Sequence, residues 1–335
     1  MKYKHKMLEE IFEQPQVLEN LLDSRINKKT KDINFPELRE VNSIFKNAKK
    51  IIFLACGSSY YTCLTAKYLL DEFNDVNSEV IYAHEFVEQK RKLEKDTVVI
   101  AVSQSGQTGD LLRALRLVKN NFIIGITNSV NSKLVQFSNI SIYTHAGEEK
   151  ALGATKSFTS QLLVLYLLMC YINKINKKSD YKKIIKDLLL VSEDIKKVLS
   201  QKNRIEKLAK KISKYKNIVI LGNKYNYPIA LEGALKLKEA TYIHTEAMPK
   251  NEITHGPLAI LDKNFLTIIL GLEKSDNKIF KKIKNTGSEI ISTKSGKSQT
   301  SSFINVVEMQ LLAYYIAVNK KINVDQPRNL NKFVK

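Results

Sequence analysis

The chain has only three cysteines among its 335 residues, Cys56, Cys63 and Cys170, and they form neither a CxxC pair nor an even-numbered set. A disulfide framework of the kind that stabilises small secreted domains is therefore excluded, because it needs paired cysteines. Separate thiols are typical of a protein kept reduced, and we expect a cytoplasmic location.

Long apolar runs are also absent. Apolar residues make up 44% of the sequence, but none of their runs approaches the roughly 18 consecutive residues that a membrane-spanning helix needs. The basic start of the chain is followed by Glu9, Glu10 and Glu13 rather than by an apolar segment, so no export signal is expected. These absences predict a soluble protein with no membrane partner, and the length suffices for about two ordinary domains.

Acidic residues are scarce relative to basic ones, 34 against 54, which gives a formal net charge of +20. Such an excess could serve nucleic acid, a membrane surface or an anionic small substrate. The lysines are spread through the chain, and the short basic groups at 2–6 and 28–31 lack the interleaved aromatics of single-strand binders. We therefore expect solvated helix faces and no nucleic-acid partner.

Recognisable metal and cofactor motifs are missing as well. The five histidines do not follow a metal-ligand spacing, and no GxGxxG loop occurs. The sequence therefore predicts neither a bound metal nor a cofactor.

The most informative stretch that is present runs from Val98 to Leu115. An apolar, β-branched run ends in the polar loop 103–109, and a helical pattern begins at Asp110. Hydroxyls and backbone N–H groups gathered at a helix N-terminus favour an anion such as phosphate. An ordinary strand-to-helix turn with a capping hydroxyl explains the loop equally well when it is taken alone.

The order of the remaining elements predicts an α/β fold. Strands alternate with helices, which indicates a parallel sheet covered on both faces, with ligands beyond the carboxyl ends of the strands. In the first half, strands are expected at 51–55, 79–82, 97–103, 122–127 and 140–143. The second half repeats this order in shorter form, with strands at 217–222, 266–270 and 290–293 and no clear fifth strand.

The expected organisation is therefore two doubly wound parallel-sheet domains in tandem, the second shortened. A helical leader (1–45) contains a helix over 7–26 with a break or restart at Pro15. The first domain covers 46–172 and ends in the apolar helix 156–171, and a lysine-rich helical connector covers 173–214. The second domain covers 215–319, with helices at 228–240 and 303–319, and a tail covers 320–335. The polar segment 294–302 is expected to be a surface turn.

Six segments in order resemble one known family. They are ACGSSY (55–60), SQSGQT (103–108), ATKSFTSQ (154–161), PIALEGALKLKEATYIHTEA (228–247), ITHGPLA (253–259) and DQPRNLNK (325–332). All are similar to the sugar isomerase (SIS) half of glucosamine-fructose-6-phosphate aminotransferases, as is the leader sequence EIFEQPQVLENLL. The resemblance covers essentially the whole chain and implies doubly wound, flavodoxin-like domains.

Two departures from the aminotransferase pattern bear on the reaction. Those enzymes carry an N-terminal glutaminase domain whose cysteine nucleophile follows the initiator Met, whereas position 2 here is Lys2, so glutamine is not expected to be the nitrogen donor within this chain. The family usually has Ser where this chain has Ala154, and that version resembles stand-alone SIS enzymes that deaminate glucosamine 6-phosphate. The region 270–303 is also shorter than in the aminotransferases.

Three charged residues of LEGALKLKEA, Glu232, Lys236 and Glu239, fall at i, i+4 and i+7 and share one helix face. A carboxylate held beside C1 and C2 of a sugar can move a proton between them. The resemblance assigns this base to Glu239, with Lys236 as charge partner or substrate contact. Without the resemblance, routine Glu–Lys pairs of an amphipathic helix would explain the pattern better.

The resemblance assigns two further catalytic residues. His255, in THGP, would open the sugar ring and would be contributed by a neighbouring subunit, which implies a homodimer. Lys332, in NLNK, would reach the open-chain sugar. By position alone, a capping or core histidine and an exposed tail lysine would be the simpler interpretations, and His244 is expected to be structural.

The remaining candidate residues would bind the phosphorylated amino sugar, since neutral hydroxyl, amide and backbone groups donate to several oxygens at once. They are Cys56, Gly57, Ser58, Ser59, Ser103, Gln104, Ser105, Thr108, Ala154 and Glu232.

The resemblance thus implies a glucosamine-6-phosphate deaminase that yields fructose 6-phosphate and ammonia. Ammonia-dependent synthesis by the reverse steps, and a fructosamine-6-phosphate deglycase, remain open as alternatives. A non-enzymatic alternative is a sugar-phosphate-sensing SIS regulator. Such regulators usually carry a helix-turn-helix domain before the SIS fold, and the ~50 leading residues leave little room for one.

Overall fold

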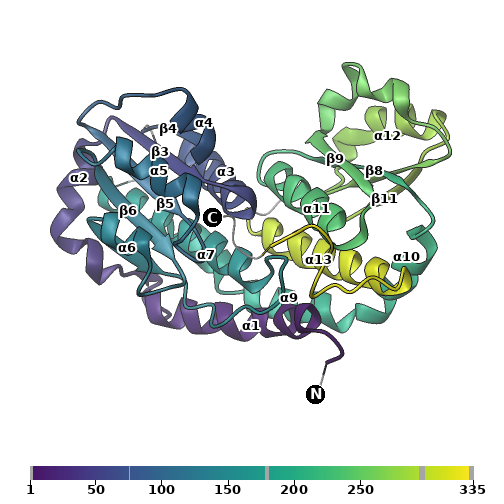
Figure 1. Ribbon diagram of the computed structural model, residues 1–335, viewed down its shortest axis with the longest axis horizontal. Helices are drawn as coiled ribbons and strands as arrows, with labels where there is room; N and C mark the ends of the chain where they lie inside the picture. The colour runs from purple at the N-terminus through teal and green to yellow at the C-terminus, as the bar shows by residue number, and fades with distance from the viewer. Residues whose placement is uncertain (1–2, 75, 178–180, 294–298, 332–335) are drawn as a thin grey trace. The chain divides into compact units, whose positions relative to one another are not determined.

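The computed structural model describes residues 3–74, 76–177, 181–293 and 299–331, which divide into two compact units (Figure 1). We call residues 16–149, 156–190 and 331 the first sheet unit, and residues 3–15, 150–155 and 191–330 the second sheet unit. Each contains one parallel α/β sheet, as the sequence predicted.

The sheet of the first unit has five parallel strands in the order β4-β3-β5-β6-β7. All five predicted strands are confirmed: β3 (Lys50–Ala55), β4 (Asn77–Tyr82), β5 (Thr97–Val102), β6 (Phe122–Thr127) and β7 (Ile140–Tyr143). Its helices are α2 (Asn42–Asn47), α3 (Gly57–Phe73), α4 (Ala83–Glu88), α5 (Gly109–Leu117), α6 (Lys133–Phe137), α7 (Lys156–Ile175) and α8 (Tyr181–Leu188), with a 3-10 helix η1 (Pro36–Val41) and a small ribbon of β1 (Ile26–Asn27) and β2 (Asp32–Ile33).

Alternating side chains of the strands build the core of this unit on both faces of the sheet. Ile52 of β3 and Val99 of β5 pack into one buried cluster with Leu111 and Leu115 of α5 and Phe86 of α4. Intervening residues of the same strands point the other way, because successive side chains of a strand face opposite sides. Helices α3 and α7 pack against each other as a second helical layer.

The sheet of the second unit has four parallel strands in the order β11-β10-β8-β9, so the second domain is the shorter one, as predicted. Three strands were expected: β8 (Asn217–Gly222), β10 (Phe265–Ile269) and β11 (Glu289–Ser292). The fourth, β9 (His244–Pro249), was not predicted, because its sequence HTEAMP is polar and ends in proline. Both features are tolerated on an edge strand, which is the place that β9 occupies.

Helices of the second unit lie where the sequence predicted them, except α12, which was not predicted. They are α9 (Val191–Ser200), α10 (Lys202–Ile212), α11 (Asn226–Thr241), α12 (Asn277–Asn285) and α13 (Ser301–Asn319), with 3-10 helices η2 (Lys250–Thr254), η3 (Pro257–Ile260) and η4 (Lys274–Asp276). The expected surface turn at 294–302 falls largely outside the described residues, and Ser301 already belongs to α13.

The expected break at Pro15 is wrong, because α1 (Lys6–Arg25) is continuous through it. A proline inside a helix leaves the carbonyl four residues earlier without its usual N–H donor. Here the side-chain amide of Gln14 donates to that carbonyl, on Ile11, at 3.0 Å. The hydroxyl of Ser192 donates to the carbonyl of Pro15 at 3.0 Å. Side chains thus supply hydrogen bonds around Pro15. The rule that proline breaks a helix considers the backbone alone and does not predict them.

Within the described residues, two helices, α7 and α13, are long and apolar enough to cross a membrane by length and composition alone. However, 89% and 78% of their most apolar windows are buried inside the protein. Each therefore serves as the central core helix of its own unit.

A buried ion pair fastens the carboxyl edge of the second sheet. The Lys250 Nζ, directly after β9, donates to a carboxylate oxygen of Asp276 at 2.6 Å and to the carbonyl of Gly271 at 3.1 Å. Both side chains are at least 90% buried, at 4% and 9% exposure. The pair thus ties the loop after β9 to the loop after β10.

We predict that Lys250→Met destabilises the protein by about 3–5 kcal/mol, because it leaves the Asp276 charge buried without its partner. Lys211→Met is the matched control, since Lys211 pairs with Glu289 at the surface and is 64% exposed. Its loss should cost no more than about 1 kcal/mol. Urea unfolding followed by circular dichroism gives both values, and equal stabilities for the two variants would contradict the buried-pair interpretation.

We also predict that the three thiols differ in accessibility. Cys63 and Cys170 are buried, and that burial raises the pKa of both thiols, whereas Cys56 is partly exposed. A thiol reagent should modify one cysteine per chain in the native protein and three after unfolding. Mass spectrometry should locate the native modification at Cys56, and rapid native labelling of Cys63 or Cys170 would contradict the packing described.

Candidate functional site

The strand order of the first sheet creates a place for a ligand beside β3. The chain runs from β3 to β4 on one side and then returns to β5 on the other side of β3. Ligands of open parallel sheets bind at such a reversal point, beyond the carboxyl ends of the strands. Cys56 follows β3 directly and Ser103 follows β5 directly, and the two strands are paired up to Leu54 and Ala101.

The segment after β3 enters a helix at once. Cys56 is the extended N-cap residue of α3, and Gly57, Ser58 and Ser59 form the first turn. The N–H groups of a first helical turn have no intrahelical acceptor, and the helix dipole adds positive potential there. This 17-residue helix therefore presents donors and two hydroxyls at the ligand edge of the sheet.

The segment after β5 is shaped by its own hydroxyls. The Oγ of Ser103 lies 2.9 Å from the Oγ1 of Thr108 and accepts the N–H of Gly106 at 3.1 Å. The Oγ of Ser105 accepts the N–H of Gln107 at 3.1 Å. The predicted phosphate-binding hydroxyls thus also have a structural task, because they hold the loop in its turn.

Gly106 is required by the close packing of this loop. Its φ is +61°, and a Cβ atom added there would lie 2.2 Å from the Oγ of Ser132. The carbonyl of Gly106 accepts the N–H of Leu134 at 3.0 Å, and the carbonyl of Gln104 accepts the N–H of Asn128 at 3.0 Å. The loop is therefore fixed against the segment that follows β6.

In the second sheet unit, helix α11 brings three of the predicted residues together. The Nζ of Lys236 lies 2.5 Å from Oε2 of Glu239 and 3.4 Å from Oε1 of Glu232. The side chains of Lys236 and Glu232 are 1% and 0% exposed, whereas that of Glu239 is 21% exposed. A buried ammonium thus holds a carboxylate that still reaches the surface of its unit.

The loop that carries Ala154 lies against this ion pair. A Cβ atom at Gly153 would be 3.5 Å from Oε2 of Glu239 and 3.6 Å from Nζ of Lys236. The loop is held in turn by Glu10 of α1, whose carboxylate accepts the backbone N–H groups of Lys150 and Ala151.

Sequence reasoning missed Gly153 and Glu10. Gly153 directly precedes a recognised motif and could have been included with it. Glu10 contacts a loop 140 residues away in the chain, and nothing in its own neighbourhood signals that contact.

His255 lies on a separate, exposed loop of the second unit, between η2 and η3. The backbone N–H of His255 donates to the carbonyl of Glu252 at 2.9 Å. The next residue, Gly256, has a φ of +126°. His244, at the start of β9, is exposed as well. The structure places His255 on a different element from the α11 group, within a loop that begins at the buried Lys250.

Lys332 lies outside the described residues, but the segment before it is anchored. The carboxylate of Asp325 accepts the backbone N–H groups of Lys6 and Met7, each at 2.9 Å. The guanidinium of Arg328 lies 4.2 Å from the ring centre of Tyr242, and the backbone N–H of Arg328 donates to the Tyr242 hydroxyl at 2.8 Å. Tyr242 caps the carboxyl end of α11, three residues after Glu239.

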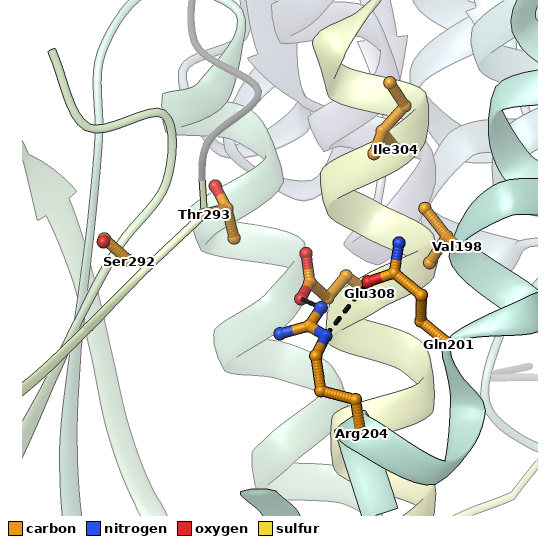
Figure 2. A pocket seen from close by; sticks show the side chains of 7 residues that line it. All are labelled: Val198, Gln201, Arg204, Ser292, Thr293, Ile304 and Glu308. Carbon is orange, nitrogen blue, oxygen red and sulfur yellow. Dashed lines mark hydrogen bonds and ion pairs between the residues drawn. The ribbon is translucent and has the colours of Figure 1, made fainter.

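A further pocket of about 440 Å³ lies in the second unit and is drawn in Figure 2. Arg204 of α10 and Glu308 of α13 form an ion pair of 2.7 Å across it. None of its described lining residues is a predicted site residue; they are Val198, Gln201, Arg204, Ser292, Thr293, Ile304 and Glu308. This pocket is therefore separate from the candidate site.

The two groups belong to different sheet units and differ in chemistry. The edge of the first sheet offers hydroxyls and helix N–H groups, which suit an anion with several oxygens. The face of α11 offers a carboxylate beside a buried ammonium, which suits the uptake and return of a proton.

Comparisons with known proteins show what this chain is similar to. The chain is 40% identical to the glutamine–fructose-6-phosphate aminotransferase [isomerizing] of Wigglesworthia glossinidia brevipalpis and 37% identical to that of Thermotoga maritima, each over 99% of this chain. It spans 58% and 59% of the length of these two relatives.

Two solved structures resemble the whole chain. The C-terminal domain of glucosamine-fructose-6-phosphate aminotransferase from Francisella tularensis has a TM-score of 0.90 at 30% identity and covers 97% of this chain and 99% of its own. Glucosamine-6-phosphate deaminase from Thermotoga maritima has a TM-score of 0.76 at 25% identity, covering 98% and 99%.

A family model also matches most of the chain. Residues 44–171 and 211–301 match the SIS domain, and these ranges contain the five strands of the first sheet and the four strands of the second. The sequence, the fold and the comparisons therefore agree that this chain belongs to the SIS domain family.

Proposed function

We propose that this chain is a sugar-phosphate enzyme that converts glucosamine 6-phosphate to fructose 6-phosphate and ammonia. The observation that carries the proposal is the Glu232–Lys236–Glu239 group on α11, with Lys236 buried and Glu239 partly exposed. Relatives named as isomerizing aminotransferases, and the fold shared with a named deaminase, support the substrate class.

Phosphate binding falls to the edge of the first sheet. Ser58 and Ser59 begin α3, and Ser105 lies in the loop between β5 and α5. Neutral donors suit this task, because they bind a dianion without fixing a second charge beside the sugar. Cys56, Gly57, Ser103, Gln104 and Thr108 lie in the same two segments, whereas the other two predicted binding residues, Ala154 and Glu232, belong to the second sheet unit.

Proton transfer falls to Glu239. His255 opens the ring, and Glu239 removes the proton from C2 of the open-chain amino aldehyde and returns a proton to C1. The product is the 2-imine of fructose 6-phosphate. Water adds at C2 and ammonia leaves, which gives fructose 6-phosphate. Lys236 acts as a positioning residue, since its ammonium holds the Glu239 carboxylate at 2.5 Å.

Other parts of the proposal come from the family resemblance. Lys332 would contact the open-chain sugar, and His255 would come from a second copy of the chain in a homodimer. The exposed position of the His255 loop is compatible with such a contribution. We also retain the cytoplasm as the expected location.

The deaminating direction is favoured by Ala154, which stands where the aminotransferases usually have serine. The opposite direction, synthesis from fructose 6-phosphate and free ammonia, is the second candidate. It is favoured by the higher identity, 40%, to a relative named as an aminotransferase. The same residues would catalyse both directions.

We predict that the purified chain releases ammonia and fructose 6-phosphate from glucosamine 6-phosphate. Glu239→Gln should lower the rate by about 10²–10⁴-fold, because general acid–base groups contribute that much. Glu246→Gln is the matched control, as Glu246 is an exposed carboxylate on the edge strand β9. A coupled ammonia assay with fructosamine 6-phosphate as a parallel substrate separates deaminase from deglycase.

Two results would overturn this proposal. One is the absence of ammonia release by the wild-type chain, together with no synthesis from fructose 6-phosphate and ammonia. The other is a Glu239→Gln variant that works at the wild-type rate.

A second prediction concerns the anchored tail. Tyr242→Ala should lower kcat by about 10-fold or more with KM little changed, because misplacement of a reacting group by an ångström is costly. Tyr242→Phe is the matched control, because it keeps the ring that Arg328 covers and removes only the hydroxyl. Tyr242→Phe should retain most of the activity. Equal kcat for Tyr242→Ala and wild type would show that the tail does not need this anchor.

A further inference from the structure

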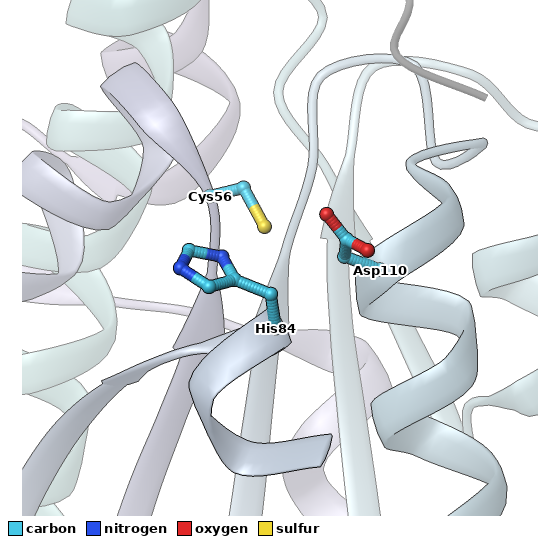
Figure 3. Close-up of side chains that lie close together, drawn as sticks. All are labelled: Cys56, His84 and Asp110. Atoms are coloured by element: carbon cyan, nitrogen blue, oxygen red, sulfur yellow. The ribbon is translucent and has the colours of Figure 1, made fainter. Parts of the chain in front are cut away.

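Three side chains of different chemistry meet at the carboxyl edge of the first sheet. A ligand atom of each of Cys56, His84 and Asp110 lies within 4.8 Å of the ligand atoms of the other two. Figure 3 shows the thiol sulfur between the imidazole ring and the carboxylate. Neither His84 nor Asp110 belongs to the set of residues that the sequence predicted for the sugar site.

The fold brings these residues together from three separate elements. Cys56 follows β3, and the last residues of β3 and β4, Ala55 and Tyr82, are paired in register. His84 therefore stands two residues beyond the paired end of β4, in the first turn of α4. Asp110 lies in the first turn of α5, which follows the next strand of the sheet. Because sheet pairing sets all three positions, the cluster does not depend on a flexible segment.

The donor set is one that zinc prefers. Zn²⁺ takes thiolate, imidazole and carboxylate ligands at roughly 2.0–2.3 Å, and three protein ligands with one open position form a recurring zinc site. Tetrahedral ligands at those lengths stand roughly 3.3–3.8 Å apart, so the present side chains need to close by about an ångström. The sequence contained no spacing signal for this site, because its ligands are 28 and 26 residues apart along the chain.

Neighbouring groups hold the Cys56 and His84 side chains in place, and His84 is accessible to solvent. The backbone N–H groups of Ala83 and His84 hydrogen-bond to the Cys56 sulfur and hold it at the edge of the sheet. The His84 ring stacks on Tyr82 at 5.4 Å between centroids, and its side chain is 48% exposed. Its contact with Glu85 is 3.8 Å, which is longer than a hydrogen bond.

Asp110 also favours a cation over an anion at this point. It places a negative charge in the first turn of α5, directly beyond the loop of hydroxyls. One of its oxygens is paired with the exposed Arg113, and a carboxylate has a second oxygen for a metal. The negative charge therefore opposes a phosphate at this position and attracts a divalent cation.

We propose that Cys56, His84 and Asp110 bind a zinc-like divalent cation. A cation there joins the first turns of α4 and α5 to Cys56, the residue before α3. Since Cys56 and Ser58 belong to the edge assigned to phosphate binding, an occupied site should impede sugar-phosphate turnover. That consequence alone rests on the proposed function, whereas metal binding does not.

The test is a metal titration of the whole reduced chain, freed of metal by chelation. Zn²⁺ is titrated in competition with a chromophoric chelator, and Co²⁺ is titrated as a spectroscopic probe, because a cobalt–thiolate bond gives a charge-transfer absorption. One Zn²⁺ should bind per chain, and the cobalt band should be present. Cys56→Ser and His84→Ser should each weaken Zn²⁺ binding by at least about tenfold, since even supporting residues of metal sites have effects of that size.

Matched controls keep the result specific. Cys63→Ser removes a buried thiol of α3, and His244→Ser removes an exposed imidazole of β9; both should bind Zn²⁺ like wild type. Stoichiometric binding that survives Cys56→Ser, or is lost equally in His244→Ser, would overturn the site, as would no competition with the chelator. If Zn²⁺ binds as expected but glucosamine 6-phosphate is not turned over, the proposed function fails and the metal site stands.

Discussion

The interaction on which the account depends most is the burial of the Lys236 ammonium between two carboxylates of one helix. A charge removed from water is costly unless it is paired, so α11 must keep Glu232 and Glu239 in place beside it. The arrangement leaves Glu239 as the member that is partly exposed. A carboxylate oriented in this way is fixed in position by the protein interior and is still available for chemistry, which is the condition for acid–base catalysis.

The two sheets have the same topology but carry different side chains at their carboxyl edges. Both are parallel sheets with the same strand order. The second strand along the chain pairs with one side of the first, and the third strand pairs with the other side of the first. In the first unit, the edge beyond β3 and β5 carries hydroxyls, a thiol and the starts of helices. In the second unit, the buried Lys250–Asp276 pair occupies the corresponding edge beside Gly271. The first edge is therefore chemically suited to a ligand, while the second is closed by the protein's own charges.

Most strands and helices could be predicted from the sequence, because the spacing of apolar residues indicates which side chains are buried. The five strands of the first sheet are short apolar runs bounded by turns, and they occur as predicted. Strand β9 was missed because an edge strand can be polar, and the helix break at Pro15 was wrong because Gln14 and Ser192 supply hydrogen bonds there. Motifs singled out Glu239 and the hydroxyl loop as candidates, whereas Glu10, Lys250 and the Cys56–His84–Asp110 cluster depend on contacts between distant segments. Such contacts leave no local pattern.

The central claim is that a carboxylate of α11 moves a proton between C2 and C1 of the sugar, and a solvent-isotope experiment tests it most directly. The chain is incubated with glucosamine 6-phosphate in D₂O, and the fructose 6-phosphate formed is analysed by NMR. A carboxylate exchanges its proton with solvent during transfer, so the account predicts deuterium at C1 in a measurable fraction of the product. Fructose 6-phosphate free of deuterium at C1, even after long incubation, would show that the proton does not pass through a carboxylate that exchanges with solvent, and would contradict the role given to Glu239.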